Sequence, residues 1–252
     1  MRHNTNNTEI TYCKFMIFAL AVTLDGLVWA LAVWLVLGGT EWGRVGGWLL
    51  LGGKGAMLLT TGVGMLVHPR LAWGLFAGRY RFASQPLHGA VQALTRFVWE
   101  LPQTGLGYLF AQWRNILGKL ERVDTLDGVT FATGRHWQKH TYAGVSLGCF
   151  ANMWVSGRIG DDFEGYARCS PFHIFGHEYG HTLDSQLWGW LYLPIVGLPS
   201  LISQALGLSH KASHRHDDFW AERRADRLGK RYFEKQRQGF NPALDREKKP
   251  HL

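Results

Sequence analysis

Apolar residues are concentrated near the start of the chain, in two long stretches. Residues 15–40 contain a single charged residue, Asp25, and residues 45–67 contain only Lys54. Each stretch exceeds the roughly 20 residues that a helix needs to cross the hydrocarbon core of a bilayer. A short polar loop separates them, so the pattern predicts a transmembrane helical hairpin over residues 15–67.

Two other structures fit part of this pattern. A cleaved signal peptide is an alternative for the first stretch, but Asp25 interrupts its apolar region and no A-x-A cleavage site follows it. A pair of buried helices in a soluble protein is an alternative for both stretches.

The two lone charges lie at similar depths in the predicted hairpin. Counted from a turn near residue 41, Asp25 lies 16 positions before it and Lys54 lies 13 positions after it. The mismatch is about 4.5 Å along a helix axis. Each charge alone costs about 2.5–3.5 kcal/mol in the middle of a bilayer. We therefore expect Asp25 and Lys54 to form an ion pair between helices that pack closely through the glycines of the second stretch.

Basic residues near the hairpin predict its orientation. Two precede the first stretch, one lies in the loop and three follow the second stretch: Arg2 and Lys14, Arg44, and Arg70, Arg79 and Arg81. The positive-inside rule then places both ends in the cytoplasm of a multi-pass protein of the cell (inner) membrane. The chain has three cysteines and no CxxC pattern, which is typical of free thiols in a reducing compartment.

Helical periodicity continues after the hairpin. Apolar residues recur at helical spacing from residue 90 up to Pro102 and again over residues 106–120. This predicts two amphipathic helices broken at Pro102, in a connector of residues 68–122. They either pack on the following domain or lie at the membrane surface.

Strand chemistry begins near residue 123. Asp127-Gly128 is a turn signal before a β-rich run, and residues 142–155 form a second run. We expect a small antiparallel sheet here. Residues 144–148 (GVSLG) suit an edge strand that binds an extended peptide, or equally a core strand with turn glycines.

The clearest chemical motif is HEYGH at residues 177–181. Ser170-Pro171 predicts the start of its helix, because serine caps free N–H groups and proline suits the first helical position. Histidines four apart lie on one face of a helix, so His177 and His181 can both bind one Zn²⁺. Glu178 beside them is placed to act on a water as general base.

A catalytic zinc site requires a third protein ligand. Asp217 or Asp218 can cap a further helix in which Glu222 and Asp226 lie one turn apart. We expect Glu222 to be the third ligand. Asp226 would accept the N–H of one zinc histidine and fix its tautomer. A solvated charged helix is the alternative interpretation.

HEYGH followed by E-x-x-A-D at residues 222–226 resembles the gluzincin class of zinc metallopeptidases, over roughly residues 140–230. The likeness is greatest to uncharacterised bacterial membrane-associated metallopeptidases, in which HEYGH runs into a segment like LYLPIVGLPS at residues 191–200. The resemblance implies an α+β fold with a zincin-like domain at residues 123–235. It also implies an HExxH helix, a neighbouring edge strand and a second ligand helix. The chain departs from the class in lacking an identifiable Tyr or His that stabilises the oxyanion.

The implied activity is zinc-dependent peptide hydrolysis on a peptide or protein substrate. Five residues are candidate oxyanion donors, with His216 preferred because it lies just before the ligand helix: Tyr179, Tyr192, His210, His214 and His216. The alternative is a scaffold or binding partner whose zinc site is structural or inactive. One of those three histidines would then close the site as a fourth ligand.

A third uncharged run covers residues 187–208. Pro194 and Pro199 interrupt it, which favours a buried or interfacial helical hairpin over a span. A single crossing would also separate the zinc histidines from Glu222. The run could dip into the bilayer and bring the zinc site toward membrane-proximal substrates.

Composition limits the remaining possibilities. With 46% hydrophobic and 18% charged residues and a mean hydropathy of −0.10, the chain is neither disordered nor made only of membrane spans. The pI of 9.6 raises the possibility of nucleic acid. However, basic residues from residue 211 onward are interspersed with acids and no recognition motif is present, so anionic lipid suits the charge better. Residues 1–14 are expected to form an N-terminal tail and residues 236–252 a loosely ordered basic one.

Overall fold

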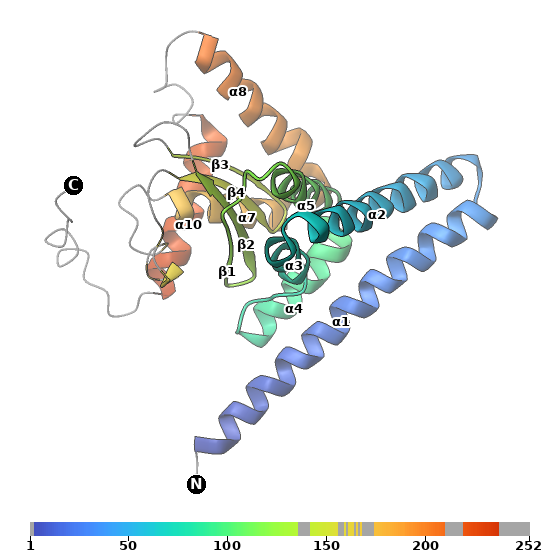
Figure 1. Cartoon of the computed structure of the whole chain (residues 1–252), viewed down its shortest axis with the longest axis horizontal. Coiled ribbons are helices and arrows are strands. Elements are labelled where there is room, and N and C mark those ends of the chain that lie inside the picture. Colours follow the sequence, from blue (N-terminus) through green and yellow to red (C-terminus); the bar gives the residue numbers. More distant parts are fainter. Residues whose placement is uncertain are drawn as a thin grey trace, which may run out of the picture.

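The computed structural model describes most of the chain: residues 3–135, 142–155, 174–209 and 219–236, together with Ile159, residues 161–163, Gly165 and Ala167. The protein is mostly helical, with two long apolar helices at its start and a small mixed sheet (Figure 1). Several predicted features lie outside the described residues, namely Ser170-Pro171, Asp217, Asp218 and the tail beyond residue 236.

The two apolar stretches form an antiparallel pair of helices, α1 (His3–Gly38) and α2 (Glu41–Val67). Thr40 caps α2, because its side chain accepts a hydrogen bond from the N–H of Gly43 at 3.2 Å. The segments Thr11–Gly38 and Glu41–Val67 are long and apolar enough to cross a membrane. Because α1 begins at His3, it extends back through most of the expected N-terminal tail.

The expected ion pair between Asp25 and Lys54 is confirmed. Lys54 Nζ donates to Asp25 Oδ1, and the side chains of two further residues reach the same carboxylate. Arg79 lies 3.1 Å from Oδ1, and the Tyr80 hydroxyl donates to Oδ2 at 3.2 Å. The sequence pattern did not indicate these two partners, which come from beyond the hairpin.

Of the glycines expected to pack α2 closely against α1, Gly47 alone does so. A Cβ at Gly47 would lie 2.8 Å from the Ala32 carbonyl oxygen on α1. A Cβ at most of the other expected glycines of α2 would meet nothing within 4 Å: Gly46, Gly52, Gly53, Gly55 and Gly62. Gly64 instead faces the connector, where a Cβ would lie 2.8 Å from Gln112 Oε1.

The connector is helical and much of it is buried. It contains α3, α4, a π-helix η1 and α5: Pro69–Gly78, Pro86–Leu94, Thr95–Trp99 and Leu101–Ile116. The expected break near Pro102 is present, because the helix is interrupted at Glu100 (φ −113°) and restarts at Leu101. Helix α3 was not predicted. Helix α5 packs against α2 on one side and β4 on the other, so it joins the hairpin to the sheet.

The sheet is mixed, so the expectation of a purely antiparallel sheet was wrong. Its strands are β1 (Arg122–Leu126), β2 (Val129–Arg135), β3 (Tyr142–Leu147) and β4 (Phe150–Val155), in the order β1-β2-β4-β3. The Asp127-Gly128 turn signal produces the antiparallel β1–β2 hairpin, with both residues at positive φ, and the run of residues 142–155 forms a second antiparallel hairpin, β3–β4. The two hairpins meet through β2 and β4, which run parallel.

Burial explains this arrangement of the strands. The central strands carry side chains that are fully buried, among them Phe131 on β2 and Met153 on β4. A turn fixes only the pairing within its own hairpin, whereas pairing between hairpins follows the need to cover the most apolar strands. Strand β3 is left at the edge of the sheet, as one of the two interpretations of residues 144–148 expected.

The C-terminal helices cover the sheet next to β3. They are α7 (Ile174–Trp188), the 3₁₀ turn η2 (Gly189–Leu191), the π-helix η3 (Leu193–Gly197), α8 (Leu198–Ser209) and α10 (Trp220–Gln236). A cluster that includes Phe131, Met153, Phe175, Tyr179 and Phe233 forms the core between the sheet, α7 and α10.

The hairpin expected within residues 187–208 does not turn at its prolines. The chain turns at Gly189 (φ +51°), and residues 193–209 then continue as helix. Pro194 lies in the first turn of η3, where a missing N–H breaks few helical hydrogen bonds, and Pro199 lies where the π-helix η3 passes into α8. Figure 1 shows α8 leaving the body of the molecule in a different direction from the α1–α2 hairpin.

Candidate metal centre

Helices α7 and α10 approach so closely that their backbones touch. A Cβ at Gly180 would overlap the carbonyl oxygen of Ala225, and a Cβ at Gly229 would overlap that of Gly176. Small residues at these positions allow the axes to come together. Side chains that project from both helices can therefore meet at one point.

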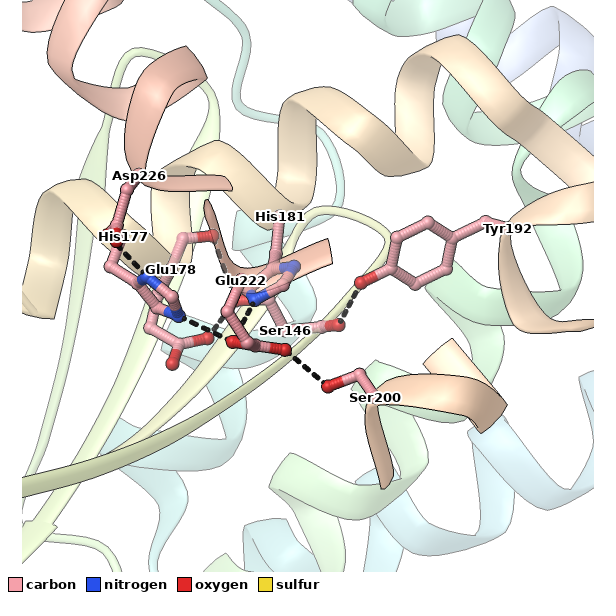
Figure 2. A network of polar contacts seen from close by, with 8 residues as sticks. All are labelled: Ser146, His177, Glu178, His181, Tyr192, Ser200, Glu222 and Asp226. Carbon is pink, nitrogen blue, oxygen red and sulfur yellow. Dashed lines mark hydrogen bonds and ion pairs between the residues drawn. The ribbon is translucent and has the colours of Figure 1, made fainter. Parts of the chain in front are cut away.

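Three candidate ligands meet at this crossing. His177 and His181 come from α7 and Glu222 from the first turn of α10. The Nε2 atoms of the two histidines lie 3.1 and 3.2 Å from the same oxygen, Glu222 Oε2. The candidate ligand atoms all lie within 4.8 Å of one another, and Figure 2 shows them converging. The structure thus brings together the three residues that the motif spacing predicted.

Two of these ligands are held by a second contact. Asp226 Oδ1 lies 2.7 Å from His177 Nδ1, which is the position expected for it. Ser200 on α8 donates a hydrogen bond to Glu222 Oε1. Each contact leaves the other end of the side chain, His177 Nε2 or Glu222 Oε2, directed at the common point. The role of Ser200 could not be read from the sequence, because nothing in its spacing links it to α10.

The charges of the cluster favour a cation. Burial lowers the pKa of His177, but hydrogen bonds to Asp226 and Glu222 outweigh burial and raise this pKa to about 10. Burial would raise the pKa of Glu222, but its contacts with His177 and His181 hold it well below the usual range. The hydrogen bond to His177 likewise lowers the pKa of Asp226. Both carboxylates therefore remain ionised beside the imidazoles.

The tautomer of His177 supports metal binding. With Nδ1–H donating to Asp226, the raised pKa of His177 places a proton between Nε2 and a carboxylate oxygen 3.1 Å away, and loss of this proton leaves a lone pair at Nε2. Two lone pairs repel at this distance unless a proton or a cation lies between them. A divalent cation would relieve the repulsion for His177 and His181 together. Two imidazole nitrogens and one carboxylate oxygen match the donor set of catalytic zinc sites, so these residues fit Zn²⁺.

Glu178 is buried between α7 and the edge strand β3. The Ser146 hydroxyl lies 2.7 Å from Glu178 Oε2, to which it donates, and 3.0 Å from the backbone oxygen of Glu178. A Cβ at Gly144 would overlap the Glu178 side chain, so only glycine leaves room for it there. Strand β3 thus holds the proposed general base, and Figure 2 shows Glu178 and Ser146 next to the ligands.

Two of the candidate oxyanion donors are engaged elsewhere. The Tyr179 hydroxyl donates to the Asp127 carbonyl at 3.4 Å, and its ring stacks on Tyr232 in the core. The Tyr192 hydroxyl donates to the Ser146 carbonyl at 3.3 Å, and burial raises its pKa strongly. The preferred candidate, His216, lies outside the described residues, as do His210 and His214.

A buried ion pair also joins the two helices. Arg224 Nε donates to Asp184 Oδ1 at 2.5 Å. Burial raises the pKa of Asp184, and Arg224 opposes this rise. Asp184 lies three positions after His181 on the same helical face, so the pair supports the crossing one turn from the ligands. This pair was not predicted from the sequence, although Arg224 belongs to the same ERRAD segment as Glu222.

Comparisons of the chain with protein-family models, with curated proteins and with solved structures found no match.

Proposed function

We propose that this protein is a membrane-anchored zinc metallopeptidase. The observation that carries this proposal is the convergence of His177, His181 and Glu222 on one point, with the Glu178 carboxylate held beside them. A structural metal site has no need of a buried carboxylate next to the ligands, whereas a hydrolytic site requires a general base. The resemblance to gluzincins supports the same activity.

Each residue has a definite role in the proposed reaction. His177, His181 and Glu222 would hold the zinc ion. When bound, zinc lowers the pKa of a coordinated water to about 7 and polarises the scissile carbonyl. Glu178 takes a proton from the attacking water and delivers it to the leaving amine. Ser146 donates to Glu178 Oε2 and Oε1 lies against Gly144, so strand β3 holds the carboxylate in place beside the ligands.

The substrate would bind along the edge of β3 at Gly144, because Tyr192 already donates to the Ser146 carbonyl. An edge strand offers backbone N–H and C=O groups to an extended peptide, which reads little of its side-chain sequence. Gly144 and Ser146 have the same orientation in β3 because side chains alternate with a period of two. They also contact Glu178. A peptide paired with this strand would pass next to the proposed general base.

The α1–α2 hairpin would be the membrane anchor. Its length and hydropathy suit two spans, and Asp25 and Lys54 neutralise each other within it. The basic residues that flank it favour cytoplasmic ends. The proposed protein is therefore a multi-pass protein of the cell membrane with its zinc centre on the cytoplasmic side.

Replacement of the general base tests the activity. We expect the Glu178→Gln variant of the full chain, purified in detergent, to retain one zinc ion per chain. Peptide cleavage should fall by a factor of about 10²–10⁴, the usual contribution of general acid–base catalysis. His181→Ala should lose both zinc and cleavage. Cleavage by Glu178→Gln at the wild-type rate would contradict the proposal. Zinc binding without any cleavage by the wild type would favour a structural site.

A further inference from the structure

A large apolar surface surrounds the end of α7. It is formed by side chains of η1, α7, η2 and α8 that are 45–62% exposed, and we name it the apolar shelf: Val98, Trp99, Leu187, Trp190, Leu191, Leu198, Leu201 and Ile202. Residues 187–209 contain no charged residue. The elements that carry these side chains are neighbours, since η1 packs on α7 and η2, and η3 joins η2 to α8. Exposed apolar side chains gathered on neighbouring elements mark a site of contact with another apolar phase or molecule.

The indole N–H groups of the shelf tryptophans already have hydrogen-bond partners within the protein. Trp190 Nε1 donates to the Val98 carbonyl at 2.9 Å, and Trp99 Nε1 donates to the Leu187 carbonyl at 3.4 Å. The indole N–H groups are therefore satisfied by the protein while the rings remain exposed. Covering these rings with hydrocarbon leaves no indole donor without a partner, which removes the main cost of burying tryptophan.

The shelf continues into the helices proposed to span the membrane. The π-helix η1 places Phe97 in a cluster with Ile17 and Ala21 of α1, while its next two residues, Val98 and Trp99, belong to the shelf. Ile17 and Ala21 lie about 9–15 Å along the helix axis from Thr11, where the apolar segment of α1 begins. The shelf thus borders the N-terminal half of this segment, at a depth that lies within the roughly 30 Å hydrocarbon core.

The helical segment of residues 193–209, which we call the arm, carries part of the shelf on one face and contacts the metal centre with another. Tyr192, Val196 and Ser200 are spaced four apart and lie on one side of the helix. The Tyr192 hydroxyl donates to the Ser146 carbonyl, Val196 is fully buried, and Ser200 donates to Glu222. The arm at residues 193–209 therefore has one face against the ligands and another that is apolar and exposed.

We propose that the apolar shelf is a second bilayer contact, in which lipid acyl chains cover the exposed faces of η1, η2 and α8. The inference rests on the proposed membrane anchoring. It places a single helix, α8, between lipid and the ligand Glu222. The substrates of the centre are accordingly membrane-proximal segments of polypeptides that lie at the bilayer surface.

Photolabelling from within the bilayer tests this contact. The full chain is reconstituted in vesicles of phosphatidylcholine and phosphatidylglycerol, with a trace of phosphatidylcholine that carries a diazirine at the end of an acyl chain. After irradiation, labelled residues are mapped by mass spectrometry. We expect label on α1, on α2 and on the shelf, and none on Arg227 or Lys230 at the exposed face of α10.

A polar variant provides the matched control. Leu201→Gln combined with Ile202→Gln should reduce labelling of residues 187–209 several-fold while labelling of α1 and α2 is unchanged. An unchanged zinc content shows that the variant is folded. A wild-type shelf without label, whether solvent or a second chain covers it, overturns the inference. Absence of label from α1 and α2 as well would overturn the proposed anchoring itself.

Discussion

At the residue scale, the orientation of the proposed site depends on three side chains outside the HExxH motif. Asp226 holds His177, Ser200 holds Glu222 and Ser146 holds Glu178. The contacts of Asp226 and Ser200 each fix one end of a ligand and leave the other end directed toward the shared point, while Ser146 and Gly144 hold the Glu178 carboxylate against β3. Contacts of this kind usually orient metal ligands and reduce the reorganisation needed during reaction.

The Asp226 contact predicts a loss of metal affinity. In Asp226→Ala, His177 loses the acceptor at its Nδ1, so its tautomer and ring orientation are no longer fixed. We expect zinc affinity to fall by a factor of about 10–100, measured by competition with a chromophoric chelator. Arg227→Ala, which changes the next exposed residue of α10, is the matched control. Equal affinity in both variants would show that Asp226 does not orient the ligand.

The Ser146 contact predicts a change in turnover alone. Ser146→Ala removes the donor to Glu178 Oε2 and leaves the carboxylate free to rotate. A loss of about 1.5 kcal/mol, at the lower end of the range for a hydrogen bond to a charged group, corresponds to a kcat just over tenfold lower. KM and zinc content should be unchanged. A parallel loss of zinc would instead assign Ser146 to the stability of the centre.

The ligands could be predicted from the sequence because helical periodicity fixes their relative positions. Histidines four apart share a face, and so do Glu222 and Asp226, whatever the rest of the fold. Ser146 and Ser200 could not be predicted. They reach the site from β3 and α8, and only the tertiary packing of those elements brings them to Glu178 and Glu222.

At the scale of elements, the backbone contact between α7 and α10 determines whether the ligands meet. Gly180→Ala introduces a Cβ that overlaps the Ala225 carbonyl, so the helices must separate. Overpacking of this kind costs about 1–3 kcal/mol. We expect a lower thermal unfolding midpoint and weaker zinc binding. Gly52→Ala, where a Cβ meets nothing within 4 Å, should leave both unchanged. A Gly180→Ala variant as stable as Gly52→Ala would contradict the close crossing.

The hairpin allows a second prediction, because Asp25 has more partners than Lys54. In Lys54→Gln, Asp25 keeps Arg79 and Tyr80 as partners. In Asp25→Asn, both cations lose their counter-charge, and an unpaired buried charge is costly. We therefore expect Asp25→Asn to lower the thermal stability of the detergent-solubilised protein more than Lys54→Gln does. The double variant should be more stable than the sum of the single effects predicts. Additive effects would show that Asp25 and Lys54 do not interact energetically.

Turn chemistry predicted the strands better than it predicted their assembly. Asp127-Gly128 indicated the first hairpin, and β3 and β4 both lie within the predicted run of residues 142–155. The parallel pairing of β2 with β4 was not predictable from turns. Likewise, Pro194 and Pro199 suggested a break that the chain makes at Gly189, because proline in a first helical turn need not end the helix.

At the scale of the whole molecule, a buried carboxyl links the connector to the helix of the metal centre. Glu100, between η1 and α5, accepts hydrogen bonds from Ser185 of α7 at 2.8 Å and from Thr95 at 3.1 Å. Burial raises the pKa of Glu100 to about 7, although Arg96 and these hydrogen bonds oppose the rise. The folded protein therefore retains a proton that the unfolded chain, with a pKa near 4.5, releases.

This raised pKa predicts how stability changes with pH. Between pH 4.5 and 7 the folded state binds more protons at Glu100, so its contribution to stability falls as pH rises, by about 3 kcal/mol in total. Glu100→Gln removes this titration. Thermal unfolding should show similar stability of the two proteins at pH 4.5 and a more stable variant at pH 8. A constant difference across this range would contradict the raised pKa.

The division of the chain into a hairpin, a connector and a domain with the metal centre was predictable, whereas the packing of these parts on one another was not. Hydrophobic runs indicated the hairpin, and motif spacing indicated the helices of the centre. The connector looked amphipathic, yet the half of α5 that the hairpin and the sheet cover is largely polar, as at Gln112 and Arg114, while Leu106 and Trp113 stay exposed. The position of this cover depends on tertiary contacts such as Arg79 with Asp25.

Zinc-dependent cleavage is the most direct test of the proposed function. The full chain in detergent is incubated with an unbiased peptide library in three states: as purified, after removal of metal by a chelator, and after one equivalent of Zn²⁺ is restored. We predict that cleavage disappears with the metal and returns with stoichiometric zinc. Cleavage that survives complete removal of the metal, or a protein that binds zinc but cleaves no peptide, would contradict it.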